Sequence, residues 1–309
     1  MVHRSHAPRG GIGGPPPVAA PRARVHGLLA LQRTAGNRAV RAMLARDVVE
    51  IGAEKVRVAT SAERTDAERI IKDVKAKYGV MFDSIAAQRT TRKHYSDLGA
   101  ATEEQLKAVD VVPWEYTELQ AIERALRHFE PVLGERRKGS SRASSAQEIV
   151  SVGKLTTSPD DDPARPNDKT LGEYFAEAQT FALFQPAPTS ATDIGALEAK
   201  ATHEIAHGVF APQLDAFMKA TGYWSAKYVK SKKRGAEAPP DSYADTNASE
   251  DLAQSVMYFF TDPDRLKNGR PGRAAGTWGN PCRKRYEFIK RVVGGWTPSS
   301  KGKPAPAKA

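Results

Sequence analysis

Apolar and polar residues along the chain follow two different periods, and these periods predict where helices and strands form. The helical period predicts helices over 62–78 and 117–129. In the second helix the apolar side chains share one face, namely Leu119, Ile122, Leu126 and Phe129. Short runs of β-branched and aromatic residues predict strands at 56–59, 148–152 and 180–184. Because helices and strands mix within one region, the pattern is typical of an α+β fold.

A further helix is predicted just upstream of Pro212. Residues 190–193 offer several side chains that can cap its first turn, and residues 194–201 are mostly good helix formers. The proline bounds the helix at or just before Ala211. The pentapeptide that begins at His203 therefore lies in the interior of the helix.

This pentapeptide reads His-Glu-Ile-Ala-His, the HExxH arrangement. Residues four positions apart lie on one face of a helix, so His203 and His207 can reach the same metal ion. Glu204, one position further round, stands beside the open coordination position as a candidate general base. No histidine follows His207, so the third protein ligand that a catalytic zinc needs should be a carboxylate. The motif predicts Zn²⁺ as the cofactor.

The segment 247–254, Asn-Ala-Ser-Glu-Asp-Leu-Ala-Gln, offers such a carboxylate. It resembles the third-ligand helix of the gluzincins, a class of HExxH zinc metallopeptidases. The resemblance implies Glu250 as the third ligand and leaves Asp251 as the alternative. Asn247 and Glu250 also have the spacing of a helix-capping box. Many gluzincins carry an acid that orients a histidine ligand where Gln254 stands, and glutamine supplies no charge there.

Tyr243 lies shortly before this segment. Its offset resembles the arrangement in delivered gluzincin toxins, which implies a hydrogen bond from Tyr243 to the oxyanion, with simple packing as the alternative. Strands and helices that precede an HExxH helix resemble the upper subdomain of zincin metallopeptidases. The resemblance implies a zincin-like fold with a small mixed sheet, an active-site helix and a mainly helical C-terminal subdomain. By analogy, strand 180–184 would be the edge strand that pairs with an extended substrate.

The net charge of +11 arises at the two ends of the chain. Residues 1–46 hold eight arginines and no acid, and residues 301–309 hold three lysines and no acid. The other basic residues equal the acidic ones at 36 each, so the predicted metallopeptidase domain, 47–300, is neutral. Nucleic acid is not an expected partner, because a domain that binds it would carry a basic footprint.

The basic N-terminal region divides into two segments. Residues 1–24 are rich in glycine and proline and are predicted to be a disordered tail, as is 301–309. Residues 25–46 have apolar positions near helical spacing and predict a basic amphipathic helical element. Its residues 31–40 resemble the LQRxxGNxAV element of proteins associated with extracellular contractile injection systems. The resemblance implies contact with components of such a system; the alternative is a basic helix that packs on the domain or binds an acidic surface.

Other features limit the class of protein. The single cysteine, Cys282, excludes an intramolecular disulfide and a cysteine-rich zinc site, and it is predicted to be structural. Apolar runs such as 181–184 are too short to span a membrane. The stretch 28–31 is too short for a secretory signal, so we expect synthesis in a bacterial cytoplasm without a signal peptide. Export or delivery into a target cell would then depend on the injection system.

Together these features predict a gluzincin-type zinc endopeptidase, a delivered effector or toxin, that acts on a protein or peptide substrate. A binding or delivery module with a structural or vestigial zinc site is the alternative from another class. A third is zinc-dependent hydrolysis of a non-peptide amide. The first two differ in coordination, because a structural zinc has four protein ligands and a catalytic one keeps a solvent ligand.

Overall fold

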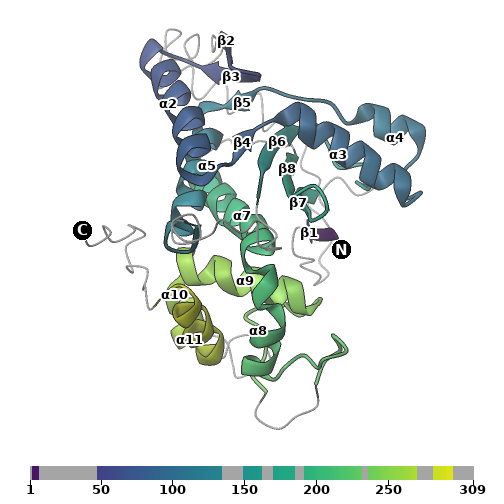
Figure 1. The fold of residues 1–309 in the computed structure, drawn as a ribbon, viewed down its shortest axis with the longest axis vertical. Helices are drawn as coiled ribbons and strands as arrows, with labels where there is room; N and C mark the ends of the chain where they lie inside the picture. The colour runs from purple at the N-terminus through teal and green to yellow at the C-terminus, as the bar shows by residue number, and fades with distance from the viewer. Residues whose placement is uncertain are drawn as a thin grey trace, which may run out of the picture.

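The computed structural model describes residues 2–6, 47–133, 149–161, 170–184, 191–231, 236–269 and 281–294. Within them the chain has an α+β fold with two small sheets and a mostly helical C-terminal part (Figure 1), which confirms the expected fold class at that level. The predicted helical element at 25–46 and the predicted tail at 301–309 lie outside the described residues.

The elements carry the labels of Figure 1. The strands are β1 (Val2–His6), β2 (Asp47–Ile51), β3 (Glu54–Val58), β4 (Met81–Phe82), β5 (Trp114–Glu115), β6 (Ser151–Leu155), β7 (Thr170–Phe175) and β8 (Thr180–Phe184). The helices are α2 (Ser61–Tyr78), α3 (Ser84–Asp97), α4 (Glu103–Ala108), α5 (Tyr116–His128), α7 (Ala191–Phe210), the 3₁₀ turn η1 (Ala211–Gln213), α8 (Leu214–Thr221), α9 (Ala248–Thr261), α10 (Pro263–Asn268) and α11 (Arg283–Val292).

The larger sheet is mixed and has the order β1-β7-β8-β6-β4. Strands β4, β6 and β8 run parallel, whereas β7 is antiparallel to β8 and β1 is antiparallel to β7. The expectation that 180–184 is an edge strand is wrong, because β8 is hydrogen-bonded between β7 and β6. A second difference concerns residues 2–6, which we expected in a disordered tail and which instead form the outermost strand β1.

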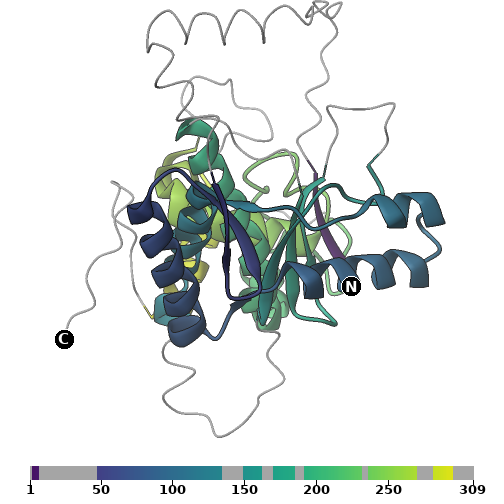
Figure 2. The same ribbon diagram turned by 90° about the horizontal axis from the view of Figure 1, so that it is seen from above.

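Two helices cover opposite faces of the larger sheet. Ala182 and Phe184 of β8 pack in a cluster with Ala87 of α3. Phe181 and Leu183, which alternate with them along the strand, belong to the cluster that includes α7. The contact with α3 is very close, because a Cβ atom at Gly153 of β6 would lie 2.3 Å from the Cβ of Ala87. In the view of Figure 2, α2 and α3 also lie on either side of the central strands.

The predicted helices form close to their expected positions. Helix α2 begins after Thr60, whose side chain accepts a hydrogen bond from the Glu63 amide at 3.1 Å, and ends at Gly79 with a φ of 67°. The predicted apolar face of α5 is buried, since its residues Leu119, Ile122, Leu126 and Phe129 are at most 1% exposed. Helix α5 thereby packs against α7, the helix that carries the histidine motif.

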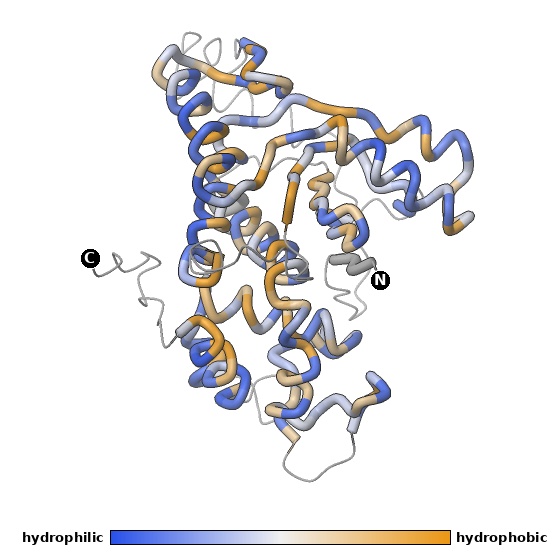
Figure 3. Tube along the Cα trace, in the orientation of Figure 1, coloured by the Kyte–Doolittle hydropathy of each residue, from blue (hydrophilic) through white to orange (hydrophobic). Residues whose placement is uncertain are grey.

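Below the sheet in Figure 1, helices α8, α9, α10 and α11 form the C-terminal part. Helix α9 packs along α7, and α8, α10 and α11 pack in turn on α9. In Figure 3 hydrophilic and hydrophobic residues recur within the turns of the outer helices α2, α3 and α11, as expected of helices with one buried face. None of the described helices combines the length and the apolar content that a bilayer crossing requires.

Candidate metal centre

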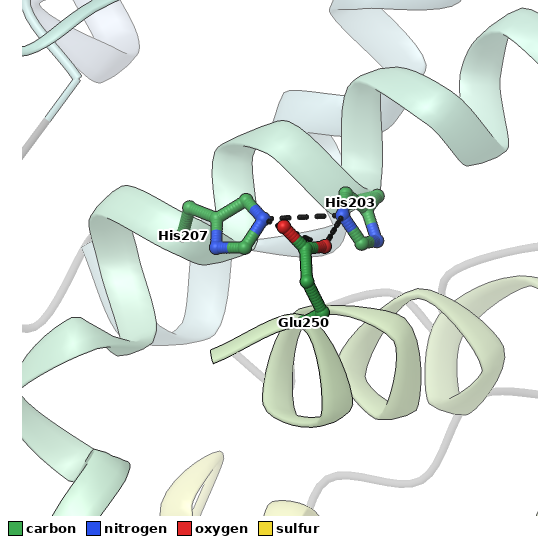
Figure 4. A group of neighbouring side chains, drawn as sticks. All are labelled: His203, His207 and Glu250. Carbon is green, nitrogen blue, oxygen red and sulfur yellow. Dashed lines mark hydrogen bonds and ion pairs between the residues drawn. The ribbon is translucent and has the colours of Figure 1, made fainter. Parts of the chain in front are cut away.

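Helix α7 carries both histidines of the predicted site. It ends at Phe210, and Pro212 lies in the 3₁₀ turn that follows, so the helix ends where the proline predicted. His203 and His207 are one turn apart, and their rings pack edge to face with centroids 4.8 Å apart. Both project toward α9, as Figure 4 shows.

Three ligand-type atoms converge between α7 and α9 (Figure 4). The Nε2 atom of His203 lies 2.9 Å from Oε2 of Glu250 and 3.1 Å from Nε2 of His207. The Nε2 atom of His207 lies 3.4 Å from the same Glu250 oxygen. All three side chains are buried, at 3% exposure or less. Among the described residues, this is the one group of histidine, cysteine and carboxylate side chains close enough together to hold a metal ion.

The geometry of the group fits a zinc ion. Nitrogen and oxygen ligands bind zinc at about 2.0–2.2 Å in a tetrahedral arrangement, which places neighbouring ligand atoms about 3.3–3.5 Å apart. The observed separations of 2.9–3.4 Å need only a small outward movement to admit the ion. Two histidines and one glutamate are also among the ligand sets of catalytic zinc sites.

The protonation states suit metal binding as well. Burial lowers the pKa of His203, which favours the neutral imidazole that can bind a cation. Burial alone would raise the pKa of Glu250, but the nearby His207 and His203 outweigh it and hold that pKa well below its usual value. The neighbouring histidines therefore favour the ionised carboxylate of Glu250, which is the form that can bind a cation.

Glu250 owes its position to the first turn of α9. The side chain of Asn247 caps this helix by accepting hydrogen bonds from the amides of Ser249 and Glu250, both at 3.0 Å. The carboxylate of Glu250 is directed at the histidines. Ser249 supports the site too, since its Oγ atom lies 3.2 Å from Nδ1 of His207. A hydrogen bond at Nδ1 fixes the ring orientation and directs Nε2 to the ion.

Two other residues singled out in the sequence lie away from the histidines. Asp251, the alternative third ligand, accepts hydrogen bonds from Arg285 and from Trp224 on the other side of α9. Gln254 donates to Asp241 at 2.8 Å and to the Tyr258 hydroxyl at 3.3 Å, so its amide is engaged with that pair.

Glu204 is completely buried beside the cluster. Its Oε1 atom lies 3.2 Å from Nζ of Lys200, one turn earlier on α7. On the sheet side it meets Gly172 of β7, where an added Cβ atom would lie 3.5 Å from Cγ of Glu204. Lys200 was not among the residues predicted from sequence, although its spacing of four from Glu204 could have indicated it.

Tyr243 lies in the turn segment before α9, and the structure brings it close to the site. Its ring centroid is 5.6 Å from that of His203, and Nζ of Lys200 lies 5.9 Å from the tyrosine ring. The lysine is therefore near both Glu204 and Tyr243. Cys282, in contrast, is far along the chain at the start of α11. Burial raises the pKa of its thiol to about 12, in keeping with a structural side chain.

Comparison of the chain with protein-family models, with curated proteins and with solved structures gave no match. What the centre can do must therefore be inferred from its own residues: two histidines and a glutamate that can hold a metal ion, and a buried carboxylate beside them.

Proposed function

We propose that this protein is a zinc-dependent endopeptidase of gluzincin type. The observation that carries the proposal is the convergence of His203, His207 and Glu250, with their ligand atoms within 3.4 Å of one another, next to the buried Glu204. These three side chains would hold Zn²⁺. When bound, zinc supplies an electrophile that acidifies water and polarises a carbonyl group.

The chain's own groups account for the proton transfers. Glu204 accepts the proton of the attacking water and passes it to the leaving amine. Lys200 pairs with Oε1 of Glu204 at 3.2 Å, which fixes the orientation of that carboxylate. Tyr243 is the candidate donor of a hydrogen bond to the carbonyl oxygen as negative charge develops there.

The structure also bears on the non-catalytic alternative. A structural zinc site needs four protein ligands, and three converge among the described residues. This count favours a site with a position left for water or substrate. A buried glutamate immediately beside the ligands further supports hydrolysis, because a purely structural site has no use for a base there.

The proposal is tested with zinc-loaded protein and a proteome-derived peptide library. Glu204→Gln should bind zinc like the wild type but cleave about 10²–10⁴-fold more slowly, because only the base is lost. Glu177→Gln, an acid-to-amide change at an exposed site, is the matched control and should retain full activity. Removal of zinc with a chelator should abolish cleavage. Equal activity in Glu204→Gln would overturn the mechanism, and cleavage only of non-peptide amides would reassign the substrate.

Delivery remains a separate proposal that rests on residues 25–46. The resemblance of residues 31–40 to the injection-system element suggests that this segment contacts components of a contractile particle that carries the enzyme out of a bacterial cytoplasm. Deletion of 25–46 should leave peptide cleavage intact and abolish co-purification with such particles. Normal loading of the deleted form would contradict this role.

A further inference from the structure

The candidate centre is closed to solvent in this structure. His203, Glu204, His207 and Glu250 each expose at most 3% of their surface. A peptide substrate has to bring its carbonyl carbon against these groups. Some segment that now covers them must therefore move before a substrate can bind.

Strand β1 is the element best placed to be that cover. It pairs with the outer edge of β7 in antiparallel register, and it also contacts α7 and α9, the two helices that supply the ligand group. Figure 1 shows it at the end of the sheet next to β7. The backbone of residues 2–6 thus lies where the larger sheet, α7 and α9 meet.

The register relates β1 to the proposed general base. Ser5 lies opposite Gly172 of β7, where an added Cβ atom would lie 3.5 Å from Cγ of Glu204. Paired strands are about 4.8 Å apart, so the backbone at Ser5 runs one strand spacing from this contact. The pairing becomes irregular directly after Ser5, at His6. An extended peptide added to the edge of β7 would occupy this same path.

We infer that residues 2–6 occupy the peptide-binding edge of β7 and inhibit the enzyme in cis. The inference rests on the proposed peptidase function. It assigns as substrates extended polypeptide segments that bind antiparallel to β7 once β1 has left. Because β1 is on the same chain, its pairing with β7 is intramolecular and does not weaken on dilution of the protein.

Backbone pairing can be removed without removing the segment. Consecutive strand residues point their amides to opposite sides, so one of His3 and Arg4 must direct its N–H group at β7. The full chain with His3→Pro and Arg4→Pro loses that amide whichever residue carries it. The matched control, His3→Ala with Arg4→Ala, loses the same side chains and keeps both amides. Hydrogen–deuterium exchange of residues 170–175 and peptide cleavage by zinc-loaded protein are measured on both and on the wild type.

We expect the proline pair to accelerate exchange of the β7 amides that face away from β8 and to raise cleavage by about tenfold. The alanine pair should match the wild type. A synthetic peptide with the sequence of residues 2–6 should then inhibit the proline pair when added at mM concentration.

The outcomes separate the two proposals. Unchanged exchange in the proline pair would overturn the placement of β1, and faster exchange with unchanged cleavage would overturn its inhibitory role. Removal of the segment by the zinc-loaded wild type, but not by Glu204→Gln, would make it a substrate and also overturn inhibition. Faster exchange with no cleavage by any form would leave the strand pairing in place and refute the peptidase function.

Discussion

Glu250 and Asp251 are adjacent in the chain and point to different sides of α9. The first reaches His203 at 2.9 Å, and the second accepts two hydrogen bonds from the guanidinium of Arg285, at 2.9 and 2.5 Å. Consecutive helix residues are about 100° apart round the axis, so two adjacent side chains in one turn of α9 can contact two different helices, α7 and α11. One acid belongs to the candidate metal centre and the other to a fully buried ion pair that ties α11 to α9.

Glu250→Gln should weaken zinc binding without unfolding the chain. The amide keeps the shape of the side chain but loses the charge that Zn²⁺ requires. Even outer partners of metal ligands contribute ten- to a hundredfold, so the affinity should fall by about a hundredfold or more. Competition with a chromophoric chelator measures the affinity, and circular dichroism checks the fold. Wild-type affinity in this variant would remove Glu250 from the ligand set.

Asp251→Asn should have the reverse effect, with zinc binding retained and stability lost. The change leaves the buried Arg285 with only one carboxylate partner, Glu237 at 3.1 Å, so the cost should approach but not exceed that of a fully broken buried pair, about 3–5 kcal/mol. Urea denaturation of the metal-free protein measures the loss. Glu287→Gln, on the exposed side of α11, is the matched control and should change stability by less than about 0.5 kcal/mol. A loss of zinc affinity as large as that of Glu250→Gln would contradict this division of roles.

Local pattern predicted the elements whose buried positions are apolar. Helix α5 buries Leu119, Ile122 and Leu126, and its period was visible in the sequence. Helix α3 was missed because its buried positions include Ser84, Thr91 and Ala87, which do not mark an apolar face. Contacts with elements distant in the sequence bury these residues.

The sequence pattern also misplaced β6, because this strand buries a charged residue. The apolar residues just before it predicted a strand at 148–152, whereas the structure has it at Ser151–Leu155. Lys154 is buried in this strand, and its charge is compensated by Glu118 of α5, 2.5 Å away. A lysine in a buried strand is unexpected until its distant partner is known.

The candidate site likewise has parts that local sequence predicts and parts that it does not. His203, Glu204 and His207 could be predicted because their geometry depends on one helix alone. Glu250 followed from the lack of a later histidine together with family resemblance. The pairing of β1 with β7 could not be predicted, because it joins residues far apart in sequence and a glycine- and proline-rich region follows it. Long-range strand pairing leaves little local signal.

Tyr243→Phe tests the proposed oxyanion donor. The substitution removes only the hydroxyl, so the ring can still pack 5.6 Å from His203. If the hydroxyl stabilises the transition state, kcat should fall by about a hundredfold, while KM and zinc content stay near wild type. Tyr228→Phe, at a ring that is 47% exposed, is the matched control and should leave kcat unchanged. Full kcat in Tyr243→Phe would assign this residue to packing.

Glu198 of α7 should make the stability of the contact between α7 and α5 dependent on pH. Burial alone would raise the pKa of Glu198, but hydrogen bonds with His128 and Arg124 outweigh it and lower that pKa. A lowered folded-state pKa gives stability that is present above the unfolded value of 4.5 and is lost as the pH falls through the folded-state value. Glu198→Gln should therefore cost about 1–2 kcal/mol near neutral pH, reduced by the partial exposure of Arg124, and progressively less in acid. Urea denaturation at several pH values measures this loss of stability.

The exposed Glu68→Gln is the control and is expected to show almost no effect. A difference between Glu198→Gln and wild type that stays constant down to acid pH would show that the carboxylate contributes no charge-dependent stability.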